Sequence, residues 1–473
     1  MVNSSMLDSM TKLVTASLPA APGPMLGEHG RLDPGFKFGF EINGKLQKDL
    51  DDVVGPLLSN ISAAKKDKYA FAVVDLTEHP GGAPSPAYAG VGDTRFMFIA
   101  SLAKILPLYA AYQLRSDLRY LKVELELLNS GPVDINRLAV QARLRYDSMR
   151  ASSINLGLPK IETFFEIKSN GVVDFTSEIK SDSELDTFHQ LSLDRPGVRG
   201  DRTQIEARKA RELLRLMAGW SDNIAASLVI RALGFKYLWS LTNRSGLYRS
   251  GWNRLTGHDT GPLGSRGLFI GRDYGGLNWG NGSERRIPNA PIGPPTQAGT
   301  ARSVAYLLTM LAQERLLNHV DHCGMYEMLR KNQNFDFLPS RGENSPIGIG
   351  THLDPLKWDA TQLGWESYDE SVPPASVPPP PGPLTASLAV SKIGMAWVKP
   401  RPTDPLITDL SNVLLVRTHQ GAVYISAVLV VIDNNTDDYP AADDDRWDVF
   451  FQFGQEMAKK LMERHGVPVP VVP

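Results

Sequence analysis

FMFIASLAKILPLYAAYQL, residues 96–114, decides the fold because it places one serine and one lysine inside an otherwise apolar, helix-like stretch. Ser101 and Lys104 lie three positions apart, a spacing that puts two side chains on one face of a helix. A buried lysine amine with a lowered pKa can accept the proton of a serine hydroxyl. The alternative is a buried helix with an incidental serine and lysine, because short motifs match by chance. Ser62-Ala63-Ala64-Lys65 matches too, but its lysine-rich surroundings predict an exposed position.

The apolar residues on both sides of Ser101 predict that it lies at the start of a buried helix. Backbone N–H groups at a helix start have no intrahelical partner, so they can face a developing oxyanion. Pro107 lies just beyond the first turn of this predicted helix, and we expect a local kink there.

A second polar motif, Ser221-Asp222-Asn223, comes directly before the apolar run 224–233. Serine and aspartate are preferred at helix N-termini, so one interpretation is a simple helix cap. The other is a functional site, in which the hydroxyl relays a proton and the amide orients a substrate carbonyl.

A third motif, Lys392-Ile393-Gly394, lies inside the predicted strand 388–398. A lysine followed by glycine is unusual within an apolar strand, and the glycine allows something to approach the strand closely. The alternative interpretation is a lysine that faces solvent from a half-exposed strand.

Strand-like segments lie near both ends of the chain, with helix-like and loop segments between them. Short apolar runs rich in β-branched residues predict strands at 69–75, 87–90, 388–398, 413–418 and 423–432. Tight turns between the last strands predict an antiparallel sheet, which we expect the first strands to join. Helical periodicity predicts one helix at 45–65, broken at Gly55-Pro56, and a final helix that ends at Gly466.

The predicted fold is therefore α+β, with an antiparallel sheet flanked by terminal helices. We predict two domains. Residues 1–115 and 385–473 form a discontinuous α/β domain around the central sheet, and residues 116–384 form a mostly helical domain with long loops. Within the second domain, 162–168 and 172–176 predict a hairpin, and the glycine-rich 257–299 predicts an irregular loop.

Composition excludes several classes of protein and site. The chain has 473 residues with 50 basic and 52 acidic side chains, so no general field favours nucleic acid or anionic membrane. A single cysteine, Cys323, excludes an internal disulfide framework, and no apolar run is long enough for a membrane span. His319, Asp321, His322 and Cys323 follow no ligand spacing typical of a metal site, so we expect no metal and no cofactor.

The three motifs, in the order S-x-x-K, S-D-N and K-x-G, resemble the set found in serine β-lactamases and penicillin-binding proteins. The segments 96–114, 220–234 and 300–313 also look like that superfamily, and the resemblance covers about residues 45–465. It implies a β-lactamase/transpeptidase-like fold with an enlarged inserted helical domain.

The resemblance also implies a role for each matching residue. Ser101 would be the acylated nucleophile and Lys104 its base, and Ser221 would relay a proton to the leaving group. Asn223 would hold Lys104 and a substrate carbonyl, while Lys392 would supply positive potential near a substrate carboxylate. The backbone N–H groups of Ser101 and Met395 would form the oxyanion hole, and Ile393 and Gly394 would border the substrate.

Three departures from the superfamily pattern change these expectations. Ile393 replaces a usual threonine or serine, which removes a hydroxyl that helps to hold a substrate carboxylate. Ser101 and Ser221 lie further apart in sequence than is usual. The region 248–298 lacks the E-x-x-x-N pattern that supplies a water-activating glutamate in class A enzymes. We therefore expect weak β-lactam hydrolysis.

Three functions stay open on the sequence. The first is a β-lactamase-like serine hydrolase that forms an acyl-enzyme on Ser101 and hydrolyses a small-molecule or peptide-like amide or ester. The second is a penicillin-binding D,D-peptidase, and the third is a catalytically inactive binding protein on the same fold. The polar N-terminus is a poor secretory signal, which favours a cytoplasmic protein, whereas the resemblance favours a periplasmic or secreted one.

Overall fold

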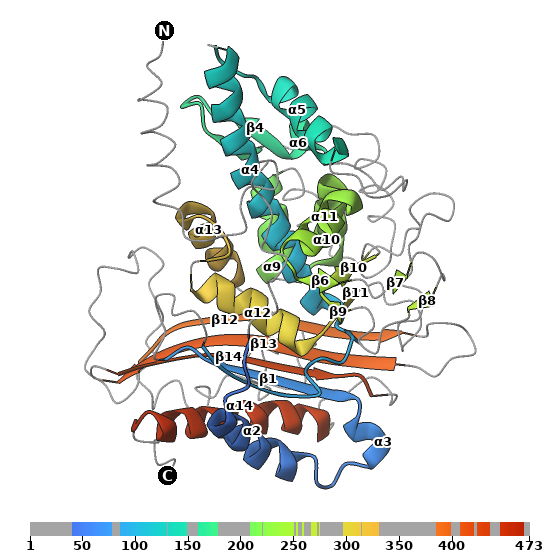
Figure 1. Ribbon diagram of the computed structural model, residues 1–473, viewed down its shortest axis with the longest axis vertical. Helices are drawn as coiled ribbons and strands as arrows, with labels where there is room; N and C mark the ends of the chain where they lie inside the picture. Colours follow the sequence, from blue (N-terminus) through green and yellow to red (C-terminus); the bar gives the residue numbers. More distant parts are fainter. Residues whose placement is uncertain are drawn as a thin grey trace, which may run out of the picture.

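The structure of the chain is a computed structural model (Figure 1). The structure describes residues 40–77, 86–129, 131–148, 159–177, 209–219, 221–249, 252–253, 258–259, 266–271, 274, 297–313, 315–330, 385–398, 407–420, 423–435 and 445–467. The proline cluster at 373–383 lies outside these residues.

A five-stranded antiparallel sheet forms the middle of the molecule (Figure 1). Its order is β12-β13-β14-β1-β2. The strands are β12 (Thr385–Val398), β13 (Ile407–Gln420), β14 (Val423–Asp433), β1 (Tyr69–Asp75) and β2 (Ala87–Val91). The N-terminal strands therefore join the C-terminal ones through the β1–β14 pair, in which Ala72 lies opposite Val430. This confirms the predicted α+β class and its antiparallel sheet.

Strand β1 is buried on both faces, because alternate side chains enter two separate hydrophobic cores. Phe71 and Val73 pack into the core beneath the two terminal helices. Ala70, Ala72 and Val74 pack into the larger core beneath the middle helices. Its sequence, YAFAVVD, consequently reads as a continuous apolar run rather than an alternating one.

Helices α2 (Gly44–Leu57) and α14 (Asp445–Arg464) lie side by side on one face of the sheet (Figure 1). The side chain of Asn43 caps α2 by accepting a hydrogen bond from Leu46 N at 3.0 Å. The predicted helix 45–65 is too long: α2 ends one residue after Pro56, and a separate short helix α3 (Ala63–Lys66) follows.

The other face carries the segment that contains Ser101. Strand β3 (Met97–Phe98) leads into the 3-10 helix η1 (Ala100–Lys104), and α4 (Ile105–Asn129) follows directly. The predicted helix therefore begins later than expected and is longer. Pro107 falls in the first turn of α4, a part of a helix where proline is tolerated. The predicted domain boundary after residue 115 falls inside α4, and the domain division stays a prediction.

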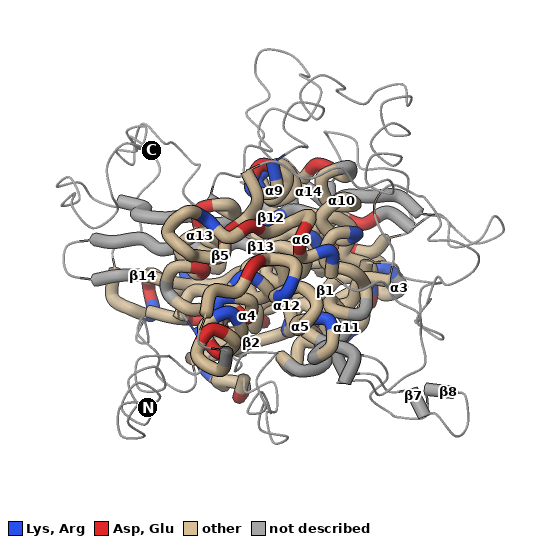
Figure 2. The backbone as a smooth tube through the Cα atoms, turned by 90° about the horizontal axis from the view of Figure 1, so that it is seen from above, with Lys and Arg blue, Asp and Glu red and all other residues tan. Residues whose placement is uncertain are grey.

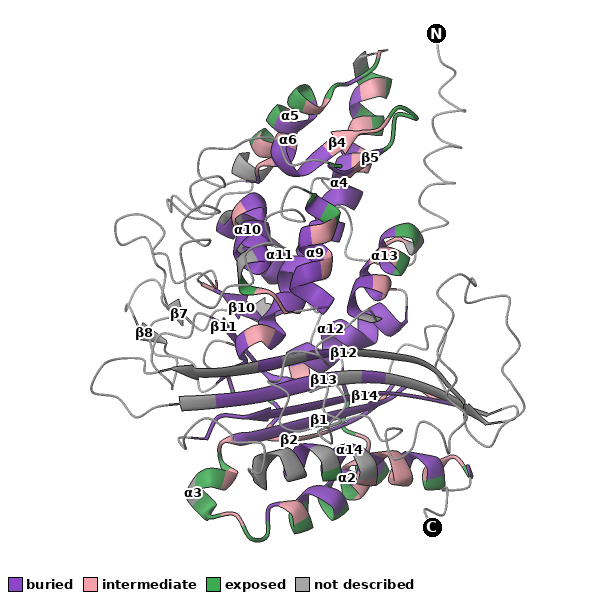
Figure 3. Cartoon of the chain, turned by 180° about the vertical axis from the view of Figure 1, so that it is seen from behind, coloured by how far each residue is buried: buried purple, intermediate pink, exposed green. Residues whose placement is uncertain are grey.

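Helix α12 (Ala301–Ala312) also lies on this face, and other helices stand above it (Figure 3). They are α5 (Ile135–Ser148), α6 (Ile161–Phe164), α9 (Ala210–Gly219), α10 (Asn223–Leu233), α11 (Phe235–Arg244) and α13 (His319–Arg330). Figure 3 shows buried residues concentrated in α9, α10 and α12.

Two predictions for the middle of the chain have different outcomes. The predicted hairpin is present as β4 (Phe165–Ile167) and β5 (Val173–Phe175), with Gly171 at φ 78° in its turn. The predicted irregular loop at 257–299 instead contains short strands in its described part. These are β8 (His258–Asp259), β9 (Arg266–Gly267), β10 (Phe269–Ile270) and β11 (Gln297–Gly299), and β8 and β9 pair with β7 (Trp252–Asn253) and β6 (Tyr248–Arg249).

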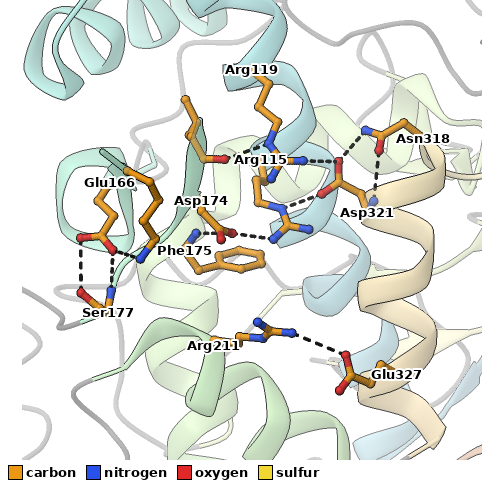
Figure 4. A network of polar contacts seen from close by, with 12 residues as sticks. Arg115, Arg119, Glu166, Asp174, Phe175, Ser177, Arg211, Asn318, Asp321 and Glu327 are labelled. Atoms are coloured by element: carbon orange, nitrogen blue, oxygen red, sulfur yellow. Dashed lines mark hydrogen bonds and ion pairs between the residues drawn. The ribbon is translucent and has the colours of Figure 1, made fainter. Parts of the chain in front are cut away.

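A buried ion-pair network joins α13 and β5 to α4 (Figure 4). Arg115 lies between two carboxylates, with its Nε 2.6 Å from Asp321 Oδ1 and its Nη1 2.6 Å from Asp174 Oδ1. Arg119 adds a longer ion pair to Asp321. Asp321 is the carboxylate of the sequence cluster His319–Cys323, and in the structure it forms ion pairs with Arg115 and Arg119. No cluster of three or more potential metal ligands occurs among the described residues.

Charged residues of both signs are interspersed along the described helices and strands (Figure 2). This distribution agrees with the near-zero formal charge of −2. Within the described part of the chain, no helix is long and apolar enough to cross a membrane.

Candidate active site

Ser101 and Lys104 meet as their spacing predicts. Both lie in η1, and Lys104 Nζ is 3.0 Å from Ser101 Oγ. Lys104 is 0% exposed, whereas Ser101 is half-buried. The amine is thus held in the protein interior, whereas the serine residue is partly exposed. The other S-x-x-K differs, because Ser62 and Lys65 are both exposed.

The second motif, Ser221-Asp222-Asn223, accepts hydrogen bonds from the same lysine. Lys104 Nζ donates to the backbone oxygen of Ser221 at 2.5 Å and to Asn223 Oδ1 at 2.6 Å. It also lies 3.3 Å from Ser221 Oγ. Asp222, between them, caps α10 by accepting a hydrogen bond from Ala225 N at 2.7 Å. The cap interpretation therefore applies to Asp222, and its two neighbours face Lys104.

The third motif reaches the site from strand β12. Lys392 Nζ lies 2.7 Å from Ser221 Oγ, and the lysine is 1% exposed. It does not face solvent, so the alternative interpretation of this motif is wrong. The structure thus brings together Ser101, Lys104, Ser221, Asn223 and Lys392, which come from three distant parts of the sequence.

Burial controls the protonation of both lysines. It lowers the pKa of Lys104 to about 7, against a smaller opposite effect of the Asp222 carboxylate. It also lowers the pKa of Lys392 well below the usual value, and the positive charge of Lys104 adds to this effect. At neutral pH a large share of Lys104 is therefore an uncharged amine that can accept a proton.

Gly394 allows β12 to lie directly against η1. A Cβ atom at this position would come within 2.3 Å of Ile99 O and 2.7 Å of Leu102 N, both of which are backbone atoms. A side chain would therefore force the strand away from the segment that carries Ser101. Ile393 and Met395 flank Gly394 in β12, opposite Asn412 and Leu410 of β13.

A buried polar network holds the backbone just before Ser101. Ser411 Oγ donates to Ile99 O at 3.1 Å and lies 3.2 Å from Asp409 Oδ2. Asn434 accepts from Phe98 N at 2.9 Å and donates to Phe98 O at 2.8 Å, and it also donates to Asp409 Oδ1. The sequence motifs gave no sign of this network, because its members are single polar residues in β13 and after β14.

The backbone is strained at two points of the site. Ala100 has φ 40° and Ser221 has φ 55°, in the left-handed region that residues with a Cβ rarely adopt. Such strain costs about 1–3 kcal/mol per residue and clusters at functional sites. Both residues adjoin or belong to the group around Lys104.

Tyr274 is a member of this group that the motifs did not indicate. Its ring centroid lies 4.4 Å from Lys104 Nζ, and its hydroxyl donates to Ala100 O at 3.0 Å. It lies in the region 248–298, where we noted the missing glutamate pattern. The sequence showed it only as one aromatic residue within a glycine-rich stretch.

Comparison with known proteins gives one family match. Residues 166–349, less than half of the chain, match the family Beta-lactamase2, described as the beta-lactamase enzyme family. The matched part contains Ser221, Asn223 and Tyr274, whereas Ser101 and Lys392 lie outside it. A search of curated proteins found no match.

Solved structures similar to this chain include three β-lactamases. The TLA-3 extended-spectrum beta-lactamase is 11% identical, with a TM-score of 0.45 over 88% of this chain and 99% of its own. A class A beta-lactamase from Bacteroides cellulosilyticus is 10% identical, with a TM-score of 0.41 over 89% and 100%. The beta-lactamase from Sphaerobacter thermophilus is 13% identical, with a TM-score of 0.40 over 90% and 99%.

The family match agrees with the resemblance that the three motifs indicated. The sheet with two terminal helices on one face, and helices on the other, is the arrangement which that resemblance implied. The family match over residues 166–349 supports the resemblance of this chain to the serine β-lactamase and penicillin-binding protein superfamily.

Proposed function

We propose that this chain is a serine hydrolase that forms an acyl-enzyme on Ser101 and hydrolyses an amide or ester. The observation that carries the proposal is the set of partners around Lys104. An uncharged amine has two N–H groups and one lone pair. Ser221 O and Asn223 Oδ1 can only accept, so they take the two N–H groups. The lone pair is then left for the proton of Ser101, whose oxygen lies 3.0 Å away.

Acylation then proceeds in balanced steps. Lys104 takes the proton of Ser101 as Oγ bonds to the substrate carbonyl carbon, whose oxygen becomes negative. The backbone N–H groups of Ser101 and Met395 stabilise that oxyanion. The bond to the leaving group breaks, and the leaving nitrogen or oxygen takes a proton from Ser221, which regains one from Lys104, so that this amine is uncharged again. Water then attacks the acyl carbonyl carbon, the bond to Ser101 Oγ breaks, one proton of the water goes to Oγ, and the acid is released.

The placement of β12 supports the proposed oxyanion hole. Because Gly394 is in close contact with the backbone of η1, the next residue, Met395, lies close to the segment that contains Ser101. The polar network around Asp409 supports the same role, since it fixes the backbone immediately before Ala100.

The proposed substrate is a neutral ester or amide rather than a penicillin. Ile393 offers no hydroxyl to a substrate carboxylate, and a charge-assisted hydrogen bond contributes about 1.5–3 kcal/mol. In the region 248–298, which lacks the water-activating glutamate pattern, the described residue that contacts Lys104 is Tyr274. A phenol with a raised pKa is a poor base for activating water. Both features favour slow hydrolysis of an acylated β-lactam.

The test is covalent labelling of the intact protein with a fluorophosphonate and with a fluorescent penicillin, read by mass spectrometry. The fluorophosphonate adduct should lie on Ser101, and Ser101→Ala should lose both the adduct and any nitrophenyl ester turnover. Its melting temperature should stay nearly unchanged, because only one hydroxyl is removed. Ser62→Ala is the matched control, since Ser62 belongs to the exposed S-x-x-K and should not matter.

The outcomes separate the three functions. Ester turnover that persists in Ser101→Ala would show that the nucleophile lies elsewhere. A stable penicillin adduct with cleavage of D-alanyl peptides would favour a D,D-peptidase. Failure of both labels to modify the wild type would favour a binding protein on this fold.

A further inference from the structure

Tyr274 contacts three parts of the site at once. Its backbone N–H donates to Ser227 Oγ at 3.0 Å, and Ser227 in turn donates to Asn223 O at 2.8 Å, within α10. Its hydroxyl donates to Ala100 O at 3.0 Å. Its ring face lies 4.4 Å from Lys104 Nζ. One residue thus links the helix that begins at Asn223, the residue before Ser101 and the lysine beside Ser101.

The hydroxyl acts on a peptide group that matters for catalysis. Ala100 O and Ser101 N belong to the same planar trans peptide unit, so fixing the oxygen also fixes the direction of the N–H. That N–H is one of the two proposed oxyanion donors. A hydrogen bond to the carbonyl also polarises the peptide group, which makes its N–H a stronger donor. Because Ala100 has the strained φ of 40°, this peptide unit needs an external contact to hold it.

The ring acts on the protonation of Lys104. The face of an aromatic ring is negative, so it favours the ammonium form over the uncharged amine. It therefore opposes burial, which favours the amine. Among the described residues, the other charged groups that act on Lys104 are the Asp222 carboxylate at the start of α10 and Lys392 on β12. The phenol itself stays protonated near neutral pH, since burial raises its pKa well above the usual value.

We infer that Tyr274 is a positioning residue, whose hydroxyl orients the Ser101 N–H and whose ring favours the ammonium form of Lys104. The inference rests on the proposed function for its hydroxyl part, because the oxyanion donor belongs to that function. The ring part concerns the lysine alone. It can therefore be tested whether or not the chain turns over a substrate.

The hydroxyl is tested with Tyr274→Phe. The second-order rate of fluorophosphonate labelling should fall about fivefold to tenfold, with no change in the pH at which the rate is half-maximal. Tyr69→Phe is the matched control, because Tyr69 is buried in the core on the opposite face of the sheet and should leave the rate unchanged. A Tyr274→Phe protein that labels at the wild-type rate would overturn this part.

The ring is tested by NMR titration of 13C-labelled lysine, with the Lys104 signal assigned from Lys104→Met. Tyr274→Leu should lower the pKa of Lys104 by about half a unit or more, whereas Tyr274→Phe should leave it nearly unchanged. If the leucine variant does not fold, pentafluorophenylalanine at position 274 keeps the ring shape with an electron-poor face, and it should lower the pKa as well. An unchanged or raised pKa of Lys104 in the leucine or pentafluorophenylalanine variant would overturn the ring part.

These measurements distinguish failure of the inference from failure of the proposed function. A wild-type protein that no acylating label modifies would contradict the proposed function and, with it, the hydroxyl part. The NMR titration would still decide the ring part. Conversely, normal labelling on Ser101 with no effect of the Tyr274 variants would contradict the inference alone.

Discussion

Lys104 and Lys392 share one hydrogen-bond partner, the hydroxyl of Ser221, at 3.3 and 2.7 Å. Two ammonium groups that meet at one buried oxygen repel each other, and both have lost most of their contact with water. This arrangement is stable only if at least one of the two amines is uncharged for much of the time. The uncharged amine that lowers this repulsion is also the form of Lys104 that can accept the proton of Ser101, so the stability of the protein and the chemistry proposed for Ser101 depend on the same protonation state.

The rate of acylation should rise with pH through about 7. Lys104 accepts a proton only in its uncharged form, and burial lowers its pKa to about 7. Below that pH the amine is occupied by a proton, so the labelling rate of Ser101 should fall about tenfold per pH unit. Stopped-flow labelling between pH 5 and 9 measures this. A flat profile over that range would contradict a role for Lys104 as base.

The free energy of unfolding should rise with pH between about 7 and 10. In this window the unfolded chain binds a proton on Lys104, whereas the folded chain does not, so raising the pH favours the folded state. One such group contributes up to about 1.4 kcal/mol per pH unit. Urea unfolding of wild type and Lys104→Met isolates this contribution, since methionine does not titrate. Equal slopes in the two proteins would contradict the lowered pKa.

Gly394→Ala should both destabilise the protein and lower its activity. The added Cβ would meet backbone atoms of Ile99 and Leu102 at distances well under contact, so β12 and η1 must move apart. We expect a loss of about 2–3 kcal/mol, typical of strongly overpacked sites, and a labelling rate at least tenfold lower. Gly55→Ala is the matched control.

Gly55 lies within α2, and a Cβ there would meet nothing within 4 Å. Its replacement by alanine should stabilise the protein by about 0.5–1 kcal/mol, because alanine favours a helix. Thermal melts of both variants provide the comparison. A Gly394→Ala protein as stable as Gly55→Ala would show that β12 and η1 are not in the close contact described.

Ile393→Thr should speed acylation by penicillins. Threonine would supply the hydroxyl that isoleucine lacks, and one hydrogen bond to a carboxylate would raise the rate about tenfold. Nitrocefin and a short-chain nitrophenyl ester are compared on wild type and variant, and only nitrocefin should respond. Wild-type nitrocefin turnover at typical enzyme rates, on the order of ten per second or more, would contradict the proposed preference for neutral substrates.

The sequence by itself determined the elements and most of the candidate site. The run YAFAVVD predicted β1 to the residue, because a strand buried on both faces must be apolar throughout. The motifs at Ser101, Ser221 and Lys392 predicted the site, because proton transfer restricts which residue types can act. Local signals also placed a break at Gly55-Pro56, although the helix ended sooner than predicted.

Only the tertiary structure decided what surrounds these residues. The pKa of Lys104 follows from its burial, against the opposite effect of the Asp222 carboxylate more than a hundred residues away, and no local pattern encodes that. The start of α4 was misplaced because apolar content alone does not separate β3 and η1 from the helix that follows. Tyr274, Asp409 and Asn434 are single polar or aromatic residues without a motif. Their contacts exist because the sheet brings β13 and β14 against the backbone before Ser101, and because Tyr274 is tied to α10 through Ser227.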